Sequence, residues 1–165
     1  MVPSPSLTPR FGSLAIVGVL LVAAARPASA QEEAVLAVVD SALARISVED
    51  KVGFTDLMVP GSVIGVVGER DGRPFFGMRS RAEERSRRMD ADVVERGFDP
   101  EVLLSGPIAT VWLPYDLYID GAWSHCGVDV FTLFRTEEGW RIASVVYSIE
   151  QPPACRQHPA GPPGG

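Results

Sequence analysis

The sequence predicts an α+β domain in which helices pack on one side of a bent antiparallel sheet. Its patterns run in the order helix, helix, strand, helix and then four strands joined as hairpins. Three of these strands lie between residues 107 and 150 and are joined by two tight turns. Asp120-Gly121 suits a type I′ turn, because both central positions of that turn need a positive φ. Glu137-Glu138-Gly139 suits a type I turn that a glycine closes with a bulge.

Residues 1–30 are typical of a signal peptide. A basic residue precedes an apolar run over 11–25, and Ala28-Ser29-Ala30 has the small-x-small form that signal peptidase cuts. The alternative is an uncleaved membrane anchor, but the run is shorter than the roughly 20 residues that a spanning helix needs. Cleavage after Ala30 would give a secreted or periplasmic protein that begins at Gln31 and has no membrane segment.

The remaining chain is acidic. Removing residues 1–30 leaves 13 basic and 21 acidic residues, so the net charge is near −8 (13 − 21). This balance argues against nucleic acid as a partner, because binding to phosphates needs a basic excess. Residues 31–151 are expected to form one domain, with neither a metal site nor a cofactor.

Residues 32–46 have the pattern of an amphipathic helix, because apolar side chains recur at the i, i+3, i+4, i+7 spacing. This stripe consists of Val35, Val38, Val39, Ala42, Leu43 and Ile46. Ser47–Asp50 is typical of a cap for a second, shorter helix that ends at Leu57. Further extended segments are expected at 62–69, 74–77 and 101–104, and residues 90–100 have no clear pattern.

The most charged segment runs from Ser80 to Met89 and begins with a capping box formed by Ser80 and Glu83. Two interpretations stay open for it. One is an anion-binding helix, and the other is a solvated helix face whose arginines form weak i, i+4 ion pairs with glutamates. The arginines concerned are Arg81, Arg85, Arg87 and Arg88.

Turn geometry fixes the register of the hairpins and therefore decides which side chains share a face. A two-residue loop at Asp120-Gly121 pairs Asp116 with His125, and pairing around the second turn places Asp129 opposite Tyr147. Because side chains alternate along a strand, one face is expected to collect Trp112, Asp116, Tyr118, His125, Asp129, Phe131 and Tyr147. The other face is expected to form an apolar core from Val111, Leu113, Leu117, Val128, Val130, Phe134, Trp140, Ile142 and Val146.

The first of these faces mixes aromatic, acidic and imidazole side chains, which is typical of a ligand cavity. A carboxylate beside a histidine makes a general acid/base, so Asp116 with His125 is one catalytic candidate. An acid beside a phenol can stabilise an enolate, so Asp129 with Tyr147 is a second. Either pair could equally be a polar contact that holds strands together. The candidates for the ligand-binding wall are Trp112, Tyr118 and Phe131.

The stretch from Gly106 to Glu150 resembles the nuclear transport factor 2-like superfamily, in its SnoaL-like and lumazine-binding branch. The resemblance rests on Trp112, Tyr115, His125-Cys126-Gly127, Asp129 and Gly139-Trp140, and it is looser over the helices from Glu32. It implies a cone-shaped α+β fold whose sheet wraps a deep cavity and which often dimerises through the outer side of the sheet. The superfamily includes dehydratases, isomerases, cyclases and binding modules, so this fold leaves the function open.

Three functional hypotheses follow. The first is an exported binding or accessory protein that holds a small apolar or aromatic ligand in the cone. The second is a cofactor-free dehydratase or isomerase, and the third is a plugged cone that acts only through its outer surface. A homodimer is expected in each case, because the predicted sheet is apolar on both faces and a symmetric partner is the simplest cover.

The end of the chain changes composition. Residues 152–165 are rich in proline and glycine, which predicts a disordered tail in which His158 is inert. Cys126 and Cys155 are the only cysteines. An exported protein meets an oxidising compartment, which favours a disulfide between them, and the alternative is a buried free thiol at Cys126.

Overall fold

The computed structural model describes residues 28–88 and 90–164. The helices are α1 (Ala28–Ser47), α2 (Lys51–Asp56) and α3 (Arg81–Ser86). The strands are β1 (Met58–Arg70), β2 (Arg73–Ser80), β3 (Val93–Gly97), β4 (Glu101–Ser105), β5 (Ile108–Ile119), β6 (Ala122–Thr136) and β7 (Gly139–Ile149). The expected signal peptide falls outside the described residues except for its last three residues, which begin α1. Within the described ranges, no helix has the length and apolarity that crossing a membrane requires.

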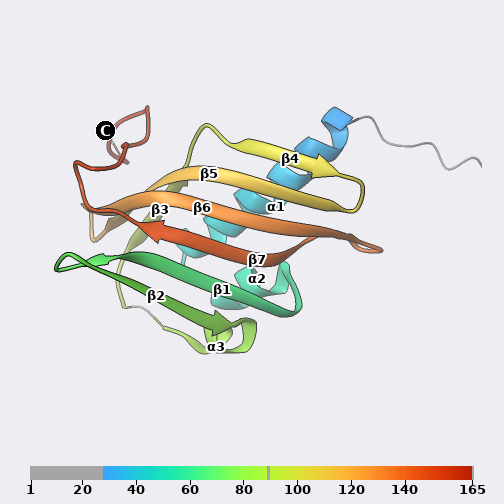
Figure 1. The fold of residues 1–165 in the computed structure, drawn as a ribbon, viewed down its shortest axis with the longest axis horizontal. Helices are drawn as coiled ribbons and strands as arrows, with labels where there is room; N and C mark the ends of the chain where they lie inside the picture. Colours follow the sequence, from blue (N-terminus) through green and yellow to red (C-terminus); the bar gives the residue numbers. More distant parts are fainter. Residues whose placement is uncertain (1–27, 89, 165) are drawn as a thin grey trace, which may run out of the picture.

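The strands form one curved sheet in the order β2-β1-β7-β6-β5-β3, with β4 also paired to β5 (Figure 1). Neighbouring strands are antiparallel except β1 and β7, which run parallel from the pair Val63–Ser144 to the pair Gly68–Ile149. The predicted α+β class is therefore confirmed, but the sheet is mixed and not purely antiparallel. Parallel pairing needs a long crossover, and the chain between β1 and β7 provides it.

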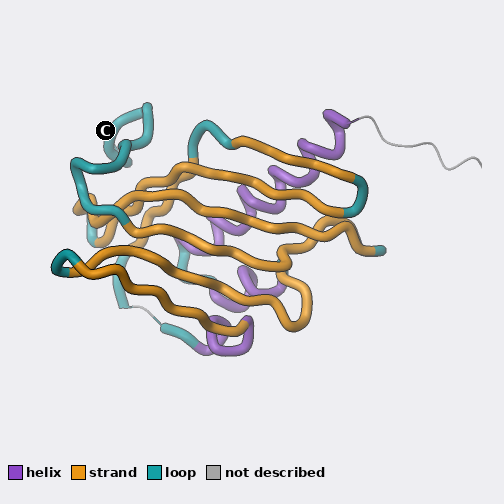
Figure 2. Tube along the Cα trace, in the orientation of Figure 1, coloured by secondary structure: helices purple, strands orange, loops and turns teal. Residues whose placement is uncertain are grey.

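Helix α1 crosses one face of the sheet (Figure 2), which we call the inner face. The predicted helix is confirmed, and most of its apolar stripe is buried. The buried helical residues are Val35, Val39, Ala42 and Leu43, and they belong to one core with Val111, Leu113, Phe131, Leu133, Trp140, Ile142 and Val145. Burying each large apolar side chain contributes about 1.5–3 kcal/mol, so this core holds α1 against the sheet.

Both short helices are capped at their N-termini, although in the predicted Ser47–Asp50 segment the cap is its last residue and Ser47 ends α1. Asp50 caps α2, because its Oδ1 accepts a hydrogen bond from the Gly53 N–H at 2.8 Å. Ser80 and Glu83 form the predicted capping box at the start of α3. Together these caps satisfy backbone groups that a helix end otherwise leaves without partners.

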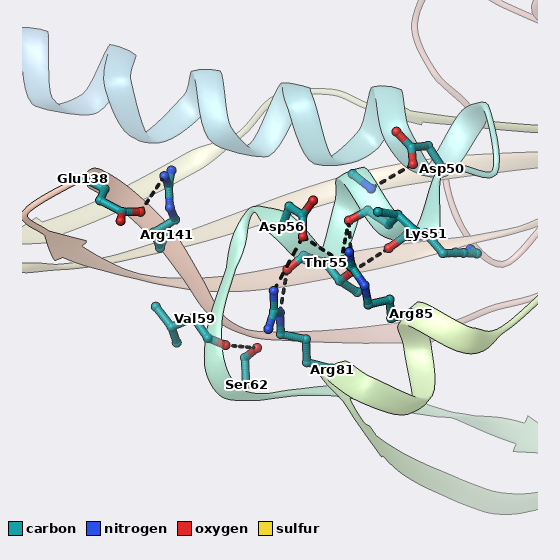
Figure 3. A network of polar contacts seen from close by, with 12 residues as sticks. Asp50, Lys51, Thr55, Asp56, Val59, Ser62, Arg81, Arg85, Glu138 and Arg141 are labelled. Atoms are coloured by element: carbon teal, nitrogen blue, oxygen red, sulfur yellow. Dashed lines mark hydrogen bonds and ion pairs between the residues drawn. The ribbon is translucent and has the colours of Figure 1, made fainter.

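Helix α3 is tied to α2 by two of the four arginines in the charged segment (Figure 3). Arg81 Nε donates to the Thr55 carbonyl oxygen at 2.6 Å. Arg85 Nη1 donates to Thr55 Oγ1 at 2.9 Å and to Asp56 Oδ1 at 2.6 Å. Arg81 and Arg85 therefore join helices and do not form the solvated face or the anion site considered for them.

The first hairpin contains a β-bulge that the sequence does not reveal. Asp120 and Gly121 both have positive φ (51° and 76°), as a type I′ turn requires. The pairs next to this turn match the prediction, but Leu117 lies opposite His125, which leaves Ser124 as an extra residue in β6. From that point the register is shifted by one residue relative to the prediction.

This shift separates the residues that were expected to share a face. Asp116 lies opposite Cys126 and not opposite His125, so the predicted Asp116–His125 pair is wrong. The predicted mixed face is divided between the inner face and the opposite face, which we call the outer face. His125, Asp129, Phe131 and Tyr147 point inward, and Trp112, Asp116 and Tyr118 point outward.

The second hairpin also contains an irregularity, but its effect on the face is small. Thr136 pairs with Gly139 at the turn, where the prediction paired it with Trp140. A second shift in register between Thr132 and Leu133 corrects this offset. Asp129 therefore lies opposite Tyr147, as predicted.

The tail is ordered by contacts with the outer face, which differs from the predicted disorder. A disulfide joins Cys126 to Cys155, with 5.9 Å between their Cα atoms. His158 N–H donates to Asp116 Oδ2 at 2.9 Å, and Gln157 donates to the Tyr118 hydroxyl. Composition alone does not reveal these contacts, because they depend on side chains that the bulge turns outward.

The rest of the outer face carries exposed apolar side chains over the whole width of the sheet. They are Val63, Val67, Phe76, Met78, Leu103, Ile108, Trp112, Phe134 and Val146. A solvated sheet face normally carries polar residues at such positions, and apolar patches of this kind are typical of interaction surfaces.

We expect the disulfide to contribute substantially to stability. It joins residues 29 apart, for which the chain-entropy model gives about 3.5 kcal/mol. Cys155→Ser should lower the free energy of unfolding by about this amount, measured by urea denaturation. Reducing the wild-type protein should give the same loss, and reducing the variant should give none. Alkylation of two thiols in the unfolded, unreduced wild-type chain would contradict the disulfide itself.

Candidate functional site

A cavity of about 170 Å³ lies between the inner face of the sheet and the segments that carry α2 and α3. Its wall is largely apolar and includes Phe54, Ile64, Val93, Leu117, Phe131 and Val145. Drug-sized ligands usually occupy pockets of roughly 300–1,000 Å³, whereas an apolar cavity of about 150 Å³ is large enough for benzene. The cavity therefore fits a ligand of about one ring.

Two carboxyl groups line this cavity close to each other. Asp129 on β6 is 3% exposed, and Glu95 on β3 is half-buried beside it. Ser47, the last residue of α1, holds Glu95 in place, since its Oγ accepts from the Glu95 N–H at 3.0 Å. Asp129 Oδ2 is buried and has no hydrogen-bond partner among the described residues.

Burial raises the pKa of both carboxyl groups. It raises the pKa of Asp129 well above the ordinary value, and the charge of Glu95 and the hydrogen bond to it raise this pKa further. Burial also raises the pKa of Glu95, although the hydrogen bond to Asp129 and the charge of Lys51 oppose this shift. The two carboxyl groups therefore titrate as a coupled pair in which the protonated form is favoured relative to isolated carboxyl groups in water.

His125 and Tyr115 both face the cavity as neutral groups. Burial lowers the pKa of His125, whose Nδ1 lies 3.0 Å from Ser124 Oγ. Burial also raises the pKa of Tyr115, whose hydroxyl donates to the Ser148 carbonyl oxygen at 2.7 Å. The rings of His125 and Tyr115 meet edge to face with 5.9 Å between centroids. A neutral imidazole is able to accept a proton.

A third carboxylate, Glu84, is buried near the cavity but stays ionised. Lys51 Nζ lies 3.4 Å from Glu84 Oε1, and Arg79 Nε donates to Glu84 Oε2. Burial alone would raise the pKa of Glu84, but the hydrogen bond and charge of Arg79 and the charge of Lys51 outweigh it and lower this pKa. Arg79 also reaches Tyr147, whose hydroxyl lies 3.5 Å from Arg79 Nη1.

The outward-pointing candidates do not belong to the cavity. Asp116 is 0% exposed and accepts two hydrogen bonds from Arg96, from Nε at 3.0 Å and from Nη2 at 2.6 Å. The Arg96 guanidinium also lies over the Tyr118 ring, 5.3 Å from its centroid. Trp112 is half exposed on the outer face. Asp116 and Tyr118 therefore hold β3, β5 and the tail together, and the predicted ligand-binding roles of Trp112 and Tyr118 do not fit this geometry.

Several groups that line the cavity were not predicted from the sequence. Glu95 lies in a segment to which no structure was assigned, and Tyr115 enters the cavity only because of the bulge. Lys51 on α2, Arg79 on β2 and Glu84 on α3 also line the cavity, and none of them was among the predicted site residues. Among the described residues, no group of His, Cys, Asp and Glu side chains is arranged to hold a metal ion.

Comparisons with known proteins show the fold. No protein-family model matches the sequence, and no curated protein is similar to it. The fold is that of a cone-shaped α+β protein with a cavity between helices and sheet. Solved structures with this architecture are repeatedly NTF2-like proteins, so the chain has the fold of the nuclear transport factor 2-like superfamily.

Three solved structures illustrate the likeness in fold, each at less than 25% sequence identity. An NTF2-like protein with a cystatin-like fold from Novosphingobium aromaticivorans has a TM-score of 0.63 at 16% identity, covering 76% of this chain and 86% of its own. The β subunit of a proposed aromatic-ring-hydroxylating dioxygenase from the same organism has a TM-score of 0.64 at 12% identity, covering 75% and 92%. A proposed dehydratase from Streptomyces avermitilis has a TM-score of 0.56 at 15% identity, covering 74% and 97%.

We expect Asp129→Asn to change how stability depends on pH. An aspartate in the unfolded chain has a pKa of about 3.9, and this pKa is raised in the folded state. The folded wild type therefore binds the proton more tightly, and its stability falls as the pH rises from about 4 through the raised pKa. Asparagine has no proton to lose. Relative to wild type, the free energy of unfolding of the variant should therefore rise as the pH increases from about 4 through the raised pKa of Asp129.

Denaturant unfolding at several pH values measures this difference, and Asp116→Asn is the contrasting variant. Asp116 is paired with Arg96 on the outer face, so its loss should lower stability by about 3–5 kcal/mol. Parallel stability curves for wild type and Asp129→Asn over this pH range would contradict the raised pKa of Asp129.

Proposed function

We propose that this protein binds a small organic ligand, about one ring in size, in the cavity of the cone. The observation that carries this proposal is Asp129 Oδ2, a buried polar atom without a hydrogen-bond partner among the described residues, in a cavity that also has apolar wall residues such as Phe131 and Val145. A buried polar group that lacks a hydrogen bond costs about 1–3 kcal/mol, and a bound ligand that supplies this bond removes the cost. Apolar cavities with a few convergent polar groups are the usual form of small-molecule sites.

We also propose that the protein is exported, with residues 1–30 removed. The apolar run and the Ala28-Ser29-Ala30 motif support this proposal. The Cys126–Cys155 disulfide supports it independently, because such bonds persist in oxidising compartments. The mature protein would then begin at Gln31 and carry its ligand outside the cytoplasm.

A cofactor-free dehydratase or isomerase is the second candidate function. The raised pKa of Asp129 makes it a candidate proton donor at one point of the cavity, and the lowered pKa of His125 makes it a candidate proton acceptor at another. Tyr147, opposite Asp129, adds a phenol to the same wall. The outward position of Asp116 removes it from this mechanism. A proposed dehydratase shares the fold, which supports this candidate only at the level of the fold.

Native mass spectrometry of protein secreted by an exporting host tests the binding proposal and the processing together. We expect a mass that corresponds to a chain beginning at Gln31, with a fraction carrying a small additional mass that is lost on denaturation. Phe131→Trp, which fills the cavity from its wall, should abolish the additional mass. A chain that starts at Met1 and stays in the membrane would contradict export. The binding proposal would be contradicted by an empty wild-type cavity that also binds no compound from a library of single-ring compounds.

The exposed outer face leads to a further proposal, that two copies associate through it. The apolar residues there span the sheet from β2 to β4, and a symmetric partner would bury them. Light scattering at tens of micromolar should give the mass of a dimer, and Trp112→Glu should convert it to a monomer. Val48→Glu is the matched control, because Val48 is exposed but lies in the turn after α1. A monomeric wild type would contradict this association.

A further inference from the structure

The charges around the cavity are not balanced. Four cationic side chains line it, namely Lys51, Arg79, Arg87 and Arg88, and three acidic ones, namely Glu84, Glu95 and Asp129. The lining therefore has a formal net charge of +1 (4 − 3), although the whole chain has a net charge of −6.

Two of the four cations, Arg87 and Arg88, are exposed to solvent where they line the cavity. Lys51 forms ion pairs with Glu49 and Glu84, and Arg79 binds Glu84, so both of these cations have acidic partners. Arg87 is 53% exposed, and its Nε lies 3.8 Å from Glu84, which is beyond hydrogen-bond distance. Arg88 donates only to backbone carbonyls, and none of the ion pairs between described residues includes it.

The local backbone explains why these two arginines differ from their neighbours. Arg81 and Arg85 lie on α3 and bind α2, as Figure 3 shows. Helix α3 ends at Ser86, and Arg87 has an extended backbone with φ −65° and ψ 150°. The chain therefore leaves the helix axis there, and Arg87 and Arg88 reach the cavity while the helical arginines do not.

We propose that the ligand of this cavity is a single-ring carboxylate whose ring lies against the apolar wall and whose carboxylate binds Arg87 and Arg88. This inference rests on the proposed binding function and adds the chemical class of the ligand. The guanidinium group presents paired N–H donors in the geometry that a carboxylate accepts. The unpartnered Asp129 Oδ2 then suits a hydrogen-bonding substituent elsewhere on the ring.

Calorimetric titration of the full chain with benzoate and with benzamide distinguishes the effect of the ligand's charge on affinity from the effect of its shape. Both probes have the single ring that the volume allows, and only benzoate carries the charge. We expect benzoate to bind about tenfold more tightly than benzamide, because hydrogen bonds to charged groups are the stronger ones. The double variant Arg87→Gln/Arg88→Gln should remove this preference and leave the affinity for benzamide unchanged.

The double variant Arg70→Gln/Arg73→Gln is the matched control. It also removes two positive charges, but from the β1–β2 hairpin, where neither residue lines the cavity. It should therefore keep the preference for benzoate. Equal loss of the preference for benzoate in both double variants would overturn the inference. The preference would then arise from the overall electrostatic field of the protein and not from contacts with Arg87 and Arg88. Equal affinity of the wild type for both probes would overturn the carboxylate class and leave the binding function standing. Failure of both probes, together with an empty cavity in native mass spectrometry, would overturn both proposals.

Discussion

One extra residue in β6 determines what the cavity contains. Ser124 has no partner in β5, and this bulge sets the register of the longest hairpin in the sheet. Since side chains alternate along a strand, a shift of one residue moves a whole set of β5 side chains to the other face. The bulge therefore sends Tyr115 and Leu117 into the cavity and Asp116 to the outer face. It also gives His125 a neighbour for its ring, because Ser124 Oγ lies 3.0 Å from His125 Nδ1.

The buried acids of the cavity avoid the cost of an isolated charge in two different ways. Transfer of an unpaired carboxylate from water into a protein interior is very costly, so such a group either gains a cation or takes up a proton. Glu84 remains charged because Arg79 and Lys51 surround it. For Asp129, burial and then the neighbouring acid Glu95 raise the pKa, which favours the protonated form. The cavity is therefore polarised, with a buried acid of raised pKa in its wall and the exposed Arg87 and Arg88 in its lining.

Local features of the fold could be predicted from the sequence, and long-range ones could not. The Asp120-Gly121 turn, the α1 stripe and the capping box of α3 depend on residues close together in the chain, and each formed as expected. The bulge at Ser124 has no residue signature, because serine is compatible with regular strand as well. The parallel pairing of β1 with β7 depends on where a distant crossover ends.

The same distinction between local and long-range features applies to the residues of the candidate site. His125, Asp129, Phe131 and Tyr147 were predicted to share a face because they lie on β6 and β7, where Asp129 pairs with Tyr147 as expected. Residues of β5 were placed on the wrong face, since the bulge lies between β5 and β6. Glu95 could not be found at all, because β3 is a short edge strand whose partner is fixed by tertiary contacts. Its role follows only from its position beside Asp129.

The tail and the exposed apolar side chains divide the outer face between them. Along β5, Tyr118 and Asp116 are buried by contacts with the tail, whereas Trp112 and Ile108 remain exposed. The disulfide from Cys155 to the buried Cys126 fixes the tail at the end of β5 that carries Asp116 and Tyr118. The tail supplies the Asp116–Arg96 pair with a backbone donor, His158 N–H, so this buried ion pair is satisfied without a partner chain. Any protein that packs on the outer face would therefore meet the apolar end of β5, and the cavity would stay open to ligands on the other side of the sheet.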